Sequence, residues 1–522
     1  MIQSNTLVGP ELIFGLVGAT GSNLASVADA LTEALSAVGY SCEPETIRVA
    51  NLLHAFPPWQ DLPTSPEDAR LNAHMDAGNE FRKLTGRSDA MAVLAIGAIQ
   101  DNRDQRTHSV DTPGPRQAFV LRSFKHPAEI EALQRVYRRR FCLVGAYASR
   151  HDRVENLAAR IAQSHHQALP DEHRAAAEAL VTRDQDEEGI QYGQHLGDAF
   201  PLADVFVNAS NPRQMREEVE RFIDLLFASP FITPNKHEYS MFLAQAAALR
   251  SAQMGRQVGA TIVNDDGDVI AVGTNEVPKA GGGAYWSDDE NDGRDHVLGY
   301  DSADRMKRQM LAEVLEKLSE AGWLKASKGS ADIDELVRQA LSRRPPGFMR
   351  GTQLMNVLEY GRPVHAEMAA VIDAARRGVS VRGCAMYVTT FPCHNCARHI
   401  VASGIQRVVY IEPYPKSLAS MLHLDAIATD AAPATHGQVE FAPFVGVAPR
   451  RFMELFTMPR RKTDDGRAIA WNAASAEPRL ADNDLTYLLR EREELGELQA
   501  ILSQNRTMFG KRRKRAQRRL AR

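Results

Sequence analysis

Short apolar runs alternate with helix-like segments over residues 12–230, and this alternation constrains the fold more than any other feature. Amphipathic segments such as 23–38 separate the runs. The runs are LIFGLVG, AMAVLAIGAI at 90–99, AFVLR at 118–122, RFCLVGAYA at 140–148 and ADVFVNAS at 203–210. Buried strands that alternate with helices form a mostly parallel sheet covered on both faces. We therefore predict that residues 1–230 form one α/β domain.

A glycine-rich turn, GLVGATGSN, follows the first apolar run, and phosphate-binding loops begin in this way. Gly15, Gly18 and Gly21 fit that pattern, but Ser22 stands where a P-loop has lysine and Asn23 where it has Ser or Thr. The missing lysine would neutralise phosphate charge, and the missing hydroxyl would hold Mg²⁺. Loop N–H groups at a helix N-terminus still favour phosphate. We predict nucleotide binding without efficient phosphoryl transfer, and a tight turn without a ligand is the alternative.

A second domain is expected over residues 231–456. Its first part has helical spacing of apolar positions at 236–255, followed by two β-rich runs around the turn signal Asp266-Gly267. Residues 276–361 are polar, glycine-rich and charged, which indicates an insertion. After it the α/β alternation returns, with a helix at 365–377, a strand at 384–390, a helix at 393–403 and a strand at 407–411.

Residues 457–522 are expected to be a third part, with one helix at 485–504 and a basic tail. The final 13 residues, GKRRKRAQRRLAR, hold eight Lys or Arg and no acid, although the whole chain has a net charge of −4. Such a tail is either a solvated end or a binder of RNA or DNA phosphates. Arg122, Lys125 and Arg150 can add positive charge to a nucleotide at the glycine-rich turn, or lie on the solvated surface.

Five cysteines are too few for a disulfide framework in 522 residues, so a reducing compartment is expected. Cys42, Cys142 and Cys384 are predicted to lie in cores. No stretch reaches the ~20 apolar residues of a membrane span, and the N-terminus has no signal-peptide pattern. We therefore expect a cytoplasmic location and no membrane partner.

The motifs PVHAEMAAV and FPCHNCARHI have the strongest chemical signal. His365, Cys393 and Cys396 supply three soft or borderline ligands, which suits Zn²⁺ with a fourth position open for catalysis. Glu367 follows His365 on the same predicted helix, so it can stand beside the metal and move a proton. The two cysteines lie in the first turn of the next helix, where thiolates are stabilised and the i,i+3 spacing points both sulfurs the same way.

Two alternatives to a catalytic site remain. A closed zinc knuckle would need a fourth ligand near the cysteine pair, and His394 and His399 are candidates. The two motifs could also be unrelated turns. The combined pattern H-x-E … P-C-x-x-C, with the cysteine pair 28 residues after the histidine, is however the signature of zinc nucleobase deaminases.

Residues 236–275 and 362–430 resemble the cytidine and deoxycytidylate deaminase superfamily, whose fold is an α/β/α sandwich. The resemblance implies hydrolytic deamination of cytosine to uracil, with His365, Cys393 and Cys396 as zinc ligands and Glu367 as the proton shuttle. It also implies substrate contacts for three further residues, Asn275 at the sugar, Ala366 and Tyr414. A turn-capping role is the alternative for Asn275, and a core or rim role for Tyr414.

Longer stretches resemble the bacterial anti-phage dCTP deaminases over residues 10–445. They are EVPKAGGGAYWSDDENDGRD, PVHAE with YIEPYPKSLA, and FKHPAEIEALQRVYRRRFCLVGAYA. This resemblance implies a P-loop kinase-like domain followed by the deaminase domain. It implies conversion of dCTP, and in some members dCMP, to uracil nucleotides during phage infection. It further implies a homo-oligomer such as a hexamer, and an inhibitory RNA bound by the N-terminal domain or the basic tail.

Two other functions are weighed against this one. A nucleic-acid-editing deaminase would use the basic tail to hold polynucleotide, but the long insertion and the nucleotide-binding first half favour free nucleotides. A nucleotide kinase with a regulatory deaminase half is the second alternative, and Ser22 in place of lysine argues against it.

Overall fold

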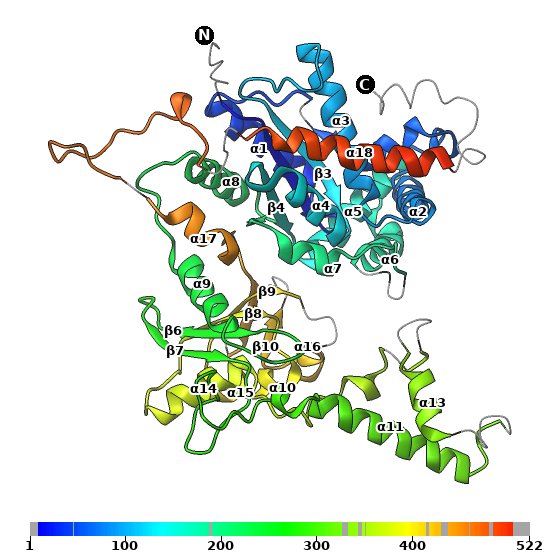
Figure 1. The fold of residues 1–522 in the computed structure, drawn as a ribbon, viewed down its shortest axis with the longest axis vertical. Helices are drawn as coiled ribbons and strands as arrows, with labels where there is room; N and C mark the ends of the chain where they lie inside the picture. Colours follow the sequence, from blue (N-terminus) through cyan, green and yellow to red (C-terminus); the bar gives the residue numbers. More distant parts are fainter. Residues whose placement is uncertain are drawn as a thin grey trace. The chain divides into compact units, whose positions relative to one another are not determined.

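The computed structural model describes residues 9–44, 46–185, 187, 190–325, 332–342, 347–349, 351–413, 417–429, 437–458, 460–479 and 484–504 (Figure 1). The chain divides into two compact units. Unit 1 comprises Met1–Glu238 and Phe444–Arg522, and unit 2 comprises Tyr239–Pro443. The described residues after Phe444 thus lie with the first unit, whereas the sequence placed part of them with the second. The basic tail lies outside the described residues.

The core of unit 1 is a sheet with strand order β12-β5-β4-β1-β3-β2. Its strands are β1 (Leu12–Gly18), β2 (Ile47–Arg48), β3 (Ala118–Phe124), β4 (Phe141–Tyr147), β5 (Val205–Asn208) and β12 (Gly446–Val447). The first five are parallel to their neighbours, and β12 pairs antiparallel with β5. Every residue of β1 is buried, as expected for a parallel strand covered on both faces. The predicted parallel sheet is confirmed.

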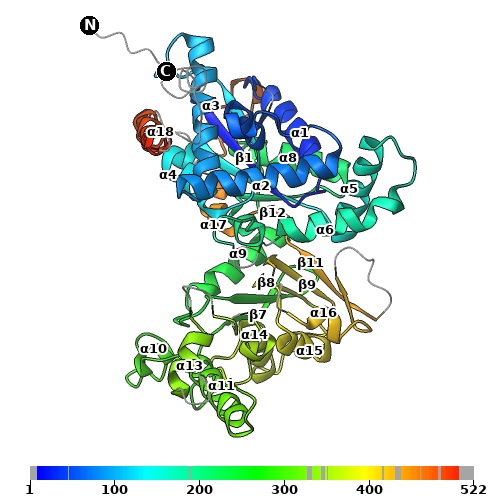
Figure 2. The ribbon, with the colours of Figure 1, turned by 90° about the vertical axis from the view of Figure 1, so that its right-hand side faces the viewer.

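Helices surround this sheet (Figure 2). The longer ones are α1 (Leu24–Ala37), α2 (Glu67–Thr85), α3 (Ala90–Thr107), α4 (Pro127–Tyr137), α5 (Arg150–Ser164), α6 (Arg174–Gln185), α8 (Pro212–Leu226), α17 (Pro449–Phe456) and α18 (Thr486–Gln504). Helix α18 confirms the predicted C-terminal helix. Cys42 and Cys142 are buried in this unit and Cys384 in the other, as predicted for core residues.

The prediction of a strand at 90–99 is wrong, because this run begins helix α3. All but one of its ten residues are buried, so this part of the helix has no polar face. A helix that is buried all round loses the apolar–polar period, and a short apolar run then cannot be told from a buried strand. The polar residues that continue the helix, QDNRDQRT, were the available signal.

A buried ionic network joins the C-terminal helix α18 to the rest of unit 1. The Arg103 guanidinium of α3 is fully buried and lies 2.8 Å from Glu11 Oε2 and 2.8 Å from Glu491 Oε2. The Tyr487 hydroxyl donates to the same Glu11 oxygen at 2.9 Å. Two carboxylates and one guanidinium thus satisfy one another away from water, which explains why this distant segment belongs to the first unit.

We expect Glu491→Ala to lower the free energy of unfolding of unit 1 by about 3–5 kcal/mol, because removing one partner of a buried ion pair leaves Arg103 with fewer acceptors. Urea unfolding followed by circular dichroism measures this change. The matched control is Glu493→Ala, an exposed position on the same helix, for which a change within about 0.5 kcal/mol is expected. Equal effects of the two variants would contradict the importance of the network.

Unit 2 contains a second six-stranded sheet, with order β10-β11-β9-β8-β6-β7. Its strands are β6 (Gly259–Val263), β7 (Val269–Thr274), β8 (Ala385–Thr390), β9 (Arg407–Glu412), β10 (Ile427–Thr429) and β11 (Val439–Pro443). Strands β6 and β7 form the predicted antiparallel hairpin, and β8, β9, β11 and β10 are parallel. The helices that pack on it include α9 (Lys236–Ala248), α14 (Ala366–Arg376), α15 (His394–Ser403) and α16 (Ala419–Leu422).

Two glycines show that α9 and α14 cover opposite faces of this sheet. A Cβ on Gly259 would lie 1.8 Å from the Ala244 carbonyl oxygen of α9, and one on Gly273 would lie 2.1 Å from the Ala366 carbonyl oxygen of α14. Gly259 pairs with the residue after Gly273, and successive residues of a strand point to opposite faces. The ribbon shows the same sandwich, with α9 on one side and α14 and α15 on the other (Figures 1 and 2).

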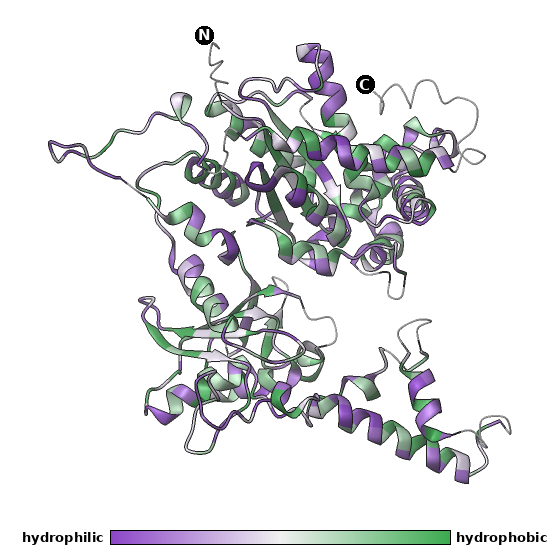
Figure 3. Ribbon diagram, in the orientation of Figure 1, coloured by the Kyte–Doolittle hydropathy of each residue, from purple (hydrophilic) through white to green (hydrophobic). Residues whose placement is uncertain are grey.

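The described part of the predicted insertion includes the helices α10 (Asp295–Leu298), α11 (Ser302–Glu320) and α13 (Ile333–Ala340). The last two form a pair. They pack on each other through a small apolar cluster, Leu311, Leu315, Leu336, Val337 and Ala340. Much of the rest of α11 is hydrophilic (Figure 3). Within the described ranges, no helix combines the length and the hydropathy that crossing a bilayer requires.

Candidate functional site

The candidate site of unit 2 lies where two helices begin. His365 is the N-cap of α14, and Cys393 is the N-cap of α15, with Cys396 in its first turn. Strand β8 ends at Thr390 and feeds directly into α15. Helix N-termini carry partial positive charge, which favours thiolates at both positions. The hydrogen bond with Cys393 and burial nevertheless raise the pKa of the Cys396 thiol.

The geometry of the three side chains fits a zinc ion. Their ligand atoms all lie within 4.8 Å of one another, and no other group of three or more His, Cys, Asp or Glu in the described part of the chain does so. His365 Nδ1 lies 3.3 Å from Cys393 Sγ and 3.4 Å from Cys396 Sγ. Tetrahedral zinc with its usual bond lengths separates nitrogen and sulfur ligands by about 3.5 Å. The three donors therefore surround one point and leave a fourth position open.

The described residues do not complete a closed knuckle. Neither His394 nor His399 joins the group of three ligands. His399 lies nearly one turn beyond Cys396 on α15 and is exposed. The open fourth position is therefore the arrangement that the structure favours, as a catalytic rather than a purely structural site requires.

Glu367 is buried beside these ligands, with 3% of its surface exposed. Burial raises the pKa of its carboxyl group above the usual range, while the neighbouring His365 acts in the opposite direction. Its side chain also makes a hydrogen bond with the Cys396 thiol. A carboxyl group in this environment can exchange a proton next to the open metal position without competing with bulk water.

The two cysteines and His365 are electrostatically linked. Hydrogen bonding with Cys393 raises the pKa of His365 to about 9. Hydrogen bonding with Cys396 and the neighbouring His365 lower the pKa of Cys393. A metal ion would replace these proton-sharing contacts, because zinc binds thiolate sulfur and neutral imidazole nitrogen.

The structure describes two of the three residues that are predicted to contact the substrate. Ala366 is fully buried in the first turn of α14, between His365 and Glu367. The Asn275 amide donates to the Arg256 carbonyl at 2.7 Å and accepts from the Val258 N–H at 2.7 Å, so it organises the loop before β6. Tyr414 lies outside the described residues. Contacts of these residues with substrate stay predictions.

Sequence reasoning missed a cationic side chain beside the cysteine loop. The Arg256 guanidinium lies 3.3 Å from Thr390 Oγ1 and 3.2 Å from Glu412 Oε2, at the ends of β8 and β9. Arg256 comes from the loop after α9, well over 100 residues before the cysteine motif. No local pattern marks it, because only the pairing of β6 with β8 brings the loop to this edge.

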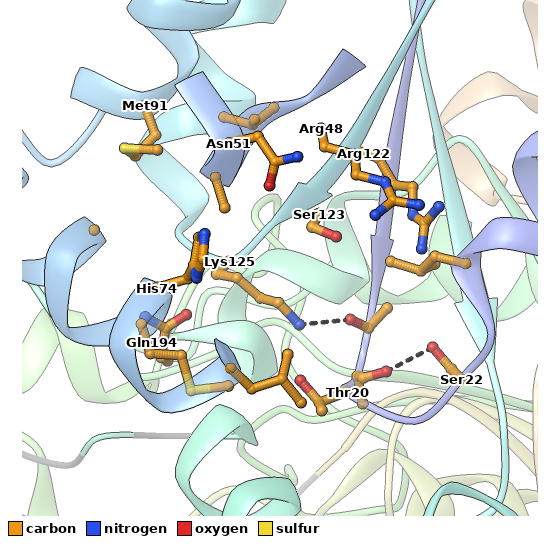
Figure 4. Close-up of a pocket in the computed structure, with 18 of the residues that line it drawn as sticks. Thr20, Ser22, Arg48, Asn51, His74, Met91, Arg122, Ser123, Lys125 and Gln194 are labelled. Carbon is orange, nitrogen blue, oxygen red and sulfur yellow. Dashed lines mark hydrogen bonds between the residues drawn. The ribbon is translucent and has the colours of Figure 1, made fainter. Parts of the chain in front are cut away.

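The predicted nucleotide-binding residues of the glycine-rich turn lie in unit 1. Gly18, Gly21, Ser22 and Asn23 line a cavity of about 160 Å³ (Figure 4). The other member, Gly15, lies inside β1 against Phe141 and outside this lining. Two of the predicted cations, Arg122 and Lys125, line the same cavity, whereas the third, Arg150, is exposed elsewhere.

Comparison with known families agrees with the site in unit 2. Residues 234–412 match the family described as the cytidine and deoxycytidylate deaminase zinc-binding region. The chain therefore contains a deaminase domain of this class, a zinc-dependent hydrolase type, and zinc is the metal of the site.

The individual relatives include deoxycytidylate deaminases. The enzyme of Enterobacteria phage T2 is 50% identical over 54 residues, which are 10% of this chain and 29% of that enzyme. The Homo sapiens enzyme is 25% identical over 174 residues, 33% of this chain and 63% of the human one. The match thus spans less than two thirds of either relative. A solved dCMP deaminase from cyanophage S-TIM5, in complex with dCMP and dUMP, is 16% identical over 41% of this chain and 98% of its own, with a TM-score of 0.22.

Proposed function

We propose that the protein hydrolytically deaminates free cytosine deoxynucleotides, converting dCMP to dUMP and dCTP to dUTP. The observation that carries this proposal is the convergence of His365, Cys393 and Cys396 beside the buried Glu367. The named relatives are deoxycytidylate deaminases, which supports a deoxynucleotide with a cytosine base.

The residues of the site have separate tasks in this reaction. His365, Cys393 and Cys396 hold the metal, and a bound zinc ion supplies Lewis-acid activation of water. Glu367 takes a proton from the attacking water and delivers it to N3 of cytosine. It then takes the second proton of that water from the new C4 hydroxyl group and delivers it to the amino group, which leaves as ammonia. The net reaction consumes one water molecule, replaces the amino group of cytosine with the carbonyl oxygen of uracil, and releases ammonia.

Triphosphate use and the biological role are the finer parts of the proposal. The resemblance of residues 10–445 to anti-phage dCTP deaminases supports dCTP as a substrate and depletion of the dCTP pool during phage infection. The same resemblance supports a P-loop kinase-like first domain, a homo-oligomer such as a hexamer, and an inhibitory RNA. A cytoplasmic location fits these roles, because the nucleotide pool is cytoplasmic.

A substrate panel tests the proposal. We expect purified zinc-loaded protein to form dUMP from dCMP and dUTP from dCTP, measured by liquid chromatography with mass detection, and to leave CTP and single-stranded DNA essentially unchanged. Uracil found only in DNA would replace the proposal by nucleic-acid editing, and no uracil product from any substrate would overturn deamination. Transfer of phosphate from ATP to a deoxynucleoside monophosphate would instead support the kinase alternative.

A further inference from the structure

The cavity of unit 1 lies at the carboxyl edge of its parallel sheet, where ligands of open α/β sheets bind. The glycine-rich loop after β1 forms one wall, and residues at the ends of β2 and β3 form another (Figure 4). Helices α2 and α5 contribute the remaining cationic side chains, Arg70, Arg82 and Arg160. Every residue that lines this cavity belongs to unit 1, whereas the deaminase site belongs to unit 2.

An internal carboxylate already occupies the anion-binding groups of the glycine-rich loop. Asp184 is fully buried, and its Oδ2 accepts from the Thr20 N–H at 2.6 Å. The Lys125 ammonium lies 2.8 Å from the same carboxylate and also donates to the Gly18 carbonyl at 2.9 Å. The Ser22 hydroxyl donates within the loop, to the Ala19 carbonyl at 2.6 Å. The backbone amide, the ammonium group and the hydroxyl group that could bind a phosphate thus already interact with other groups of the protein.

Two arginines at the opposite wall have no such partner. The register of β2 and β3 pairs Arg48 directly with Arg122, so both side chains leave the sheet on the same face. Their guanidinium groups lie close together (Figure 4). Among the described residues, no carboxylate forms a hydrogen bond or ion pair with either one. Like charges opposite each other in a sheet destabilise it, so this arrangement points to an anion between them.

The electrostatics of the cavity agree with this inference. Burial lowers the pKa of Arg122 to about 10, and the nearby charges of Arg48 and Arg160 add to the decrease. Asp29 acts in the opposite direction without forming an ion pair with Arg122. Arg160 makes a long contact of 3.8 Å with Glu67. Arg70 already donates two hydrogen bonds to this carboxylate.

Cationic side chains outnumber the carboxylates that compensate them. The six cations of the lining are Arg48, Arg70, Arg82, Arg122, Lys125 and Arg160. The carboxylates paired with them are Glu67, Glu129 and Asp184. The difference leaves about three positive charges, enough to bind a phosphate dianion. Planar guanidinium groups suit phosphate oxygens, which they bind in pairs.

We propose that this cavity binds a nucleoside monophosphate whose phosphate group lies between Arg48, Arg122 and Arg160, and not in the glycine-rich loop. The remaining lining supports a nucleoside, because it combines apolar and amide groups that can stack on and hydrogen-bond a base. These residues are Asn51, Leu71, His74, Met75, Met91 and Gln194. The glycine-rich loop then serves to hold the ion pair between Lys125 and Asp184. The arginines bind the phosphate group in its place.

Titration calorimetry on the full-length protein tests the site. The probes are inorganic phosphate, AMP, GMP and dTMP, which lack cytosine and therefore avoid confusion with a deaminase substrate. We expect at least one monophosphate to bind more tightly than inorganic phosphate. We expect Arg122→Gln and Arg48→Gln each to weaken its binding by about 10–100-fold, since a hydrogen bond to a charged group contributes this much.

The matched control is Arg213→Gln in α8, whose side chain is 90% exposed, and this variant should bind like the unchanged protein. Equal affinity of Arg122→Gln and Arg213→Gln would overturn the arginine site. Inorganic phosphate bound as tightly as every monophosphate would overturn the nucleoside assignment.

ATP distinguishes the arginine site from the loop. We expect the affinity for ATP to depend on Arg48 and Arg122, as the affinity for the monophosphate does. We also expect Asp184→Asn to strengthen ATP binding, because it removes the competing negative charge from the loop. Tight ATP binding that is indifferent to both arginine substitutions would place the phosphate in the loop and overturn the proposal. If Asp184→Asn does not fold, as judged by circular dichroism, the two arginine variants still decide the question.

Discussion

Replacement of Glu367 by alanine is expected to abolish most deaminase activity while zinc remains bound. The carboxyl group is buried beside the metal ligands but does not belong to the group of three that converges on the metal position. A positioned acid–base group contributes about 10²–10⁴-fold to a rate, so kcat should fall by at least that range. Product formation from dCMP and dCTP measures the rate, and plasma mass spectrometry measures the zinc content.

Two further variants make this test specific. Glu367→Gln keeps the shape of the side chain but cannot take up the proton, and we expect it to be as inactive as Glu367→Ala. Glu440→Gln, at a half-exposed position of β11 in the same unit, should retain normal activity and zinc. Activity of Glu367→Gln close to that of Glu440→Gln would refute proton transfer by Glu367. Loss of zinc in the Glu367 variants would show that this residue maintains the metal site.

Replacement of His365 by alanine is expected to remove the metal itself. Two thiolates remain, and they make a poor zinc site on their own. Loss of an outer partner of a metal ligand already costs about 10–100-fold in affinity, so loss of a ligand should exceed 100-fold. Because metal binding stabilises the folded state, the midpoint temperature of the thermal unfolding of unit 2 should also fall. Competition with a chromogenic chelator and differential scanning fluorimetry measure the two effects.

The control for this variant is His399→Ala, an exposed position on the helix that carries the cysteines. We expect it to keep zinc and the normal thermal transition. Loss of zinc from His399→Ala would revive the closed four-ligand knuckle. Retention of zinc at normal affinity by His365→Ala would instead remove His365 from the ligand set and with it the proposed site.

The chemistry of unit 2 could be predicted because its decisive spacings are local. His365 and Glu367 are two residues apart, Cys393 and Cys396 are three apart, and each pair starts a helix. Helical geometry then determines how the members of each pair lie relative to one another. The local spacings do not tell how close the two helices lie to each other. The structure brings His365 Nδ1 within 3.4 Å of both sulfurs.

The errors arose where burial hides the local pattern. The apolar run at 90–99 is helical, but the start of α3 is almost entirely buried, so it lacks the polar face that would distinguish it from a strand. The described segments after Phe444 lie with unit 1 because of contacts far apart along the chain. Strand β12 pairs with β5, and Arg103 binds Glu491.

The sequence alone was enough to predict the metal ligands and the proton-transfer group and to indicate the deaminase class, since these depend on residue types at short and regular spacings. Whether the glycine-rich loop is free to bind a phosphate depends on the tertiary structure. Asp184 reaches Thr20 across 164 residues, and strand pairing brings Arg48 beside Arg122. The physical reason is that charge compensation depends on distance in space, and neither the neutralised loop nor the uncompensated arginines can be recognised before the sheet is assembled.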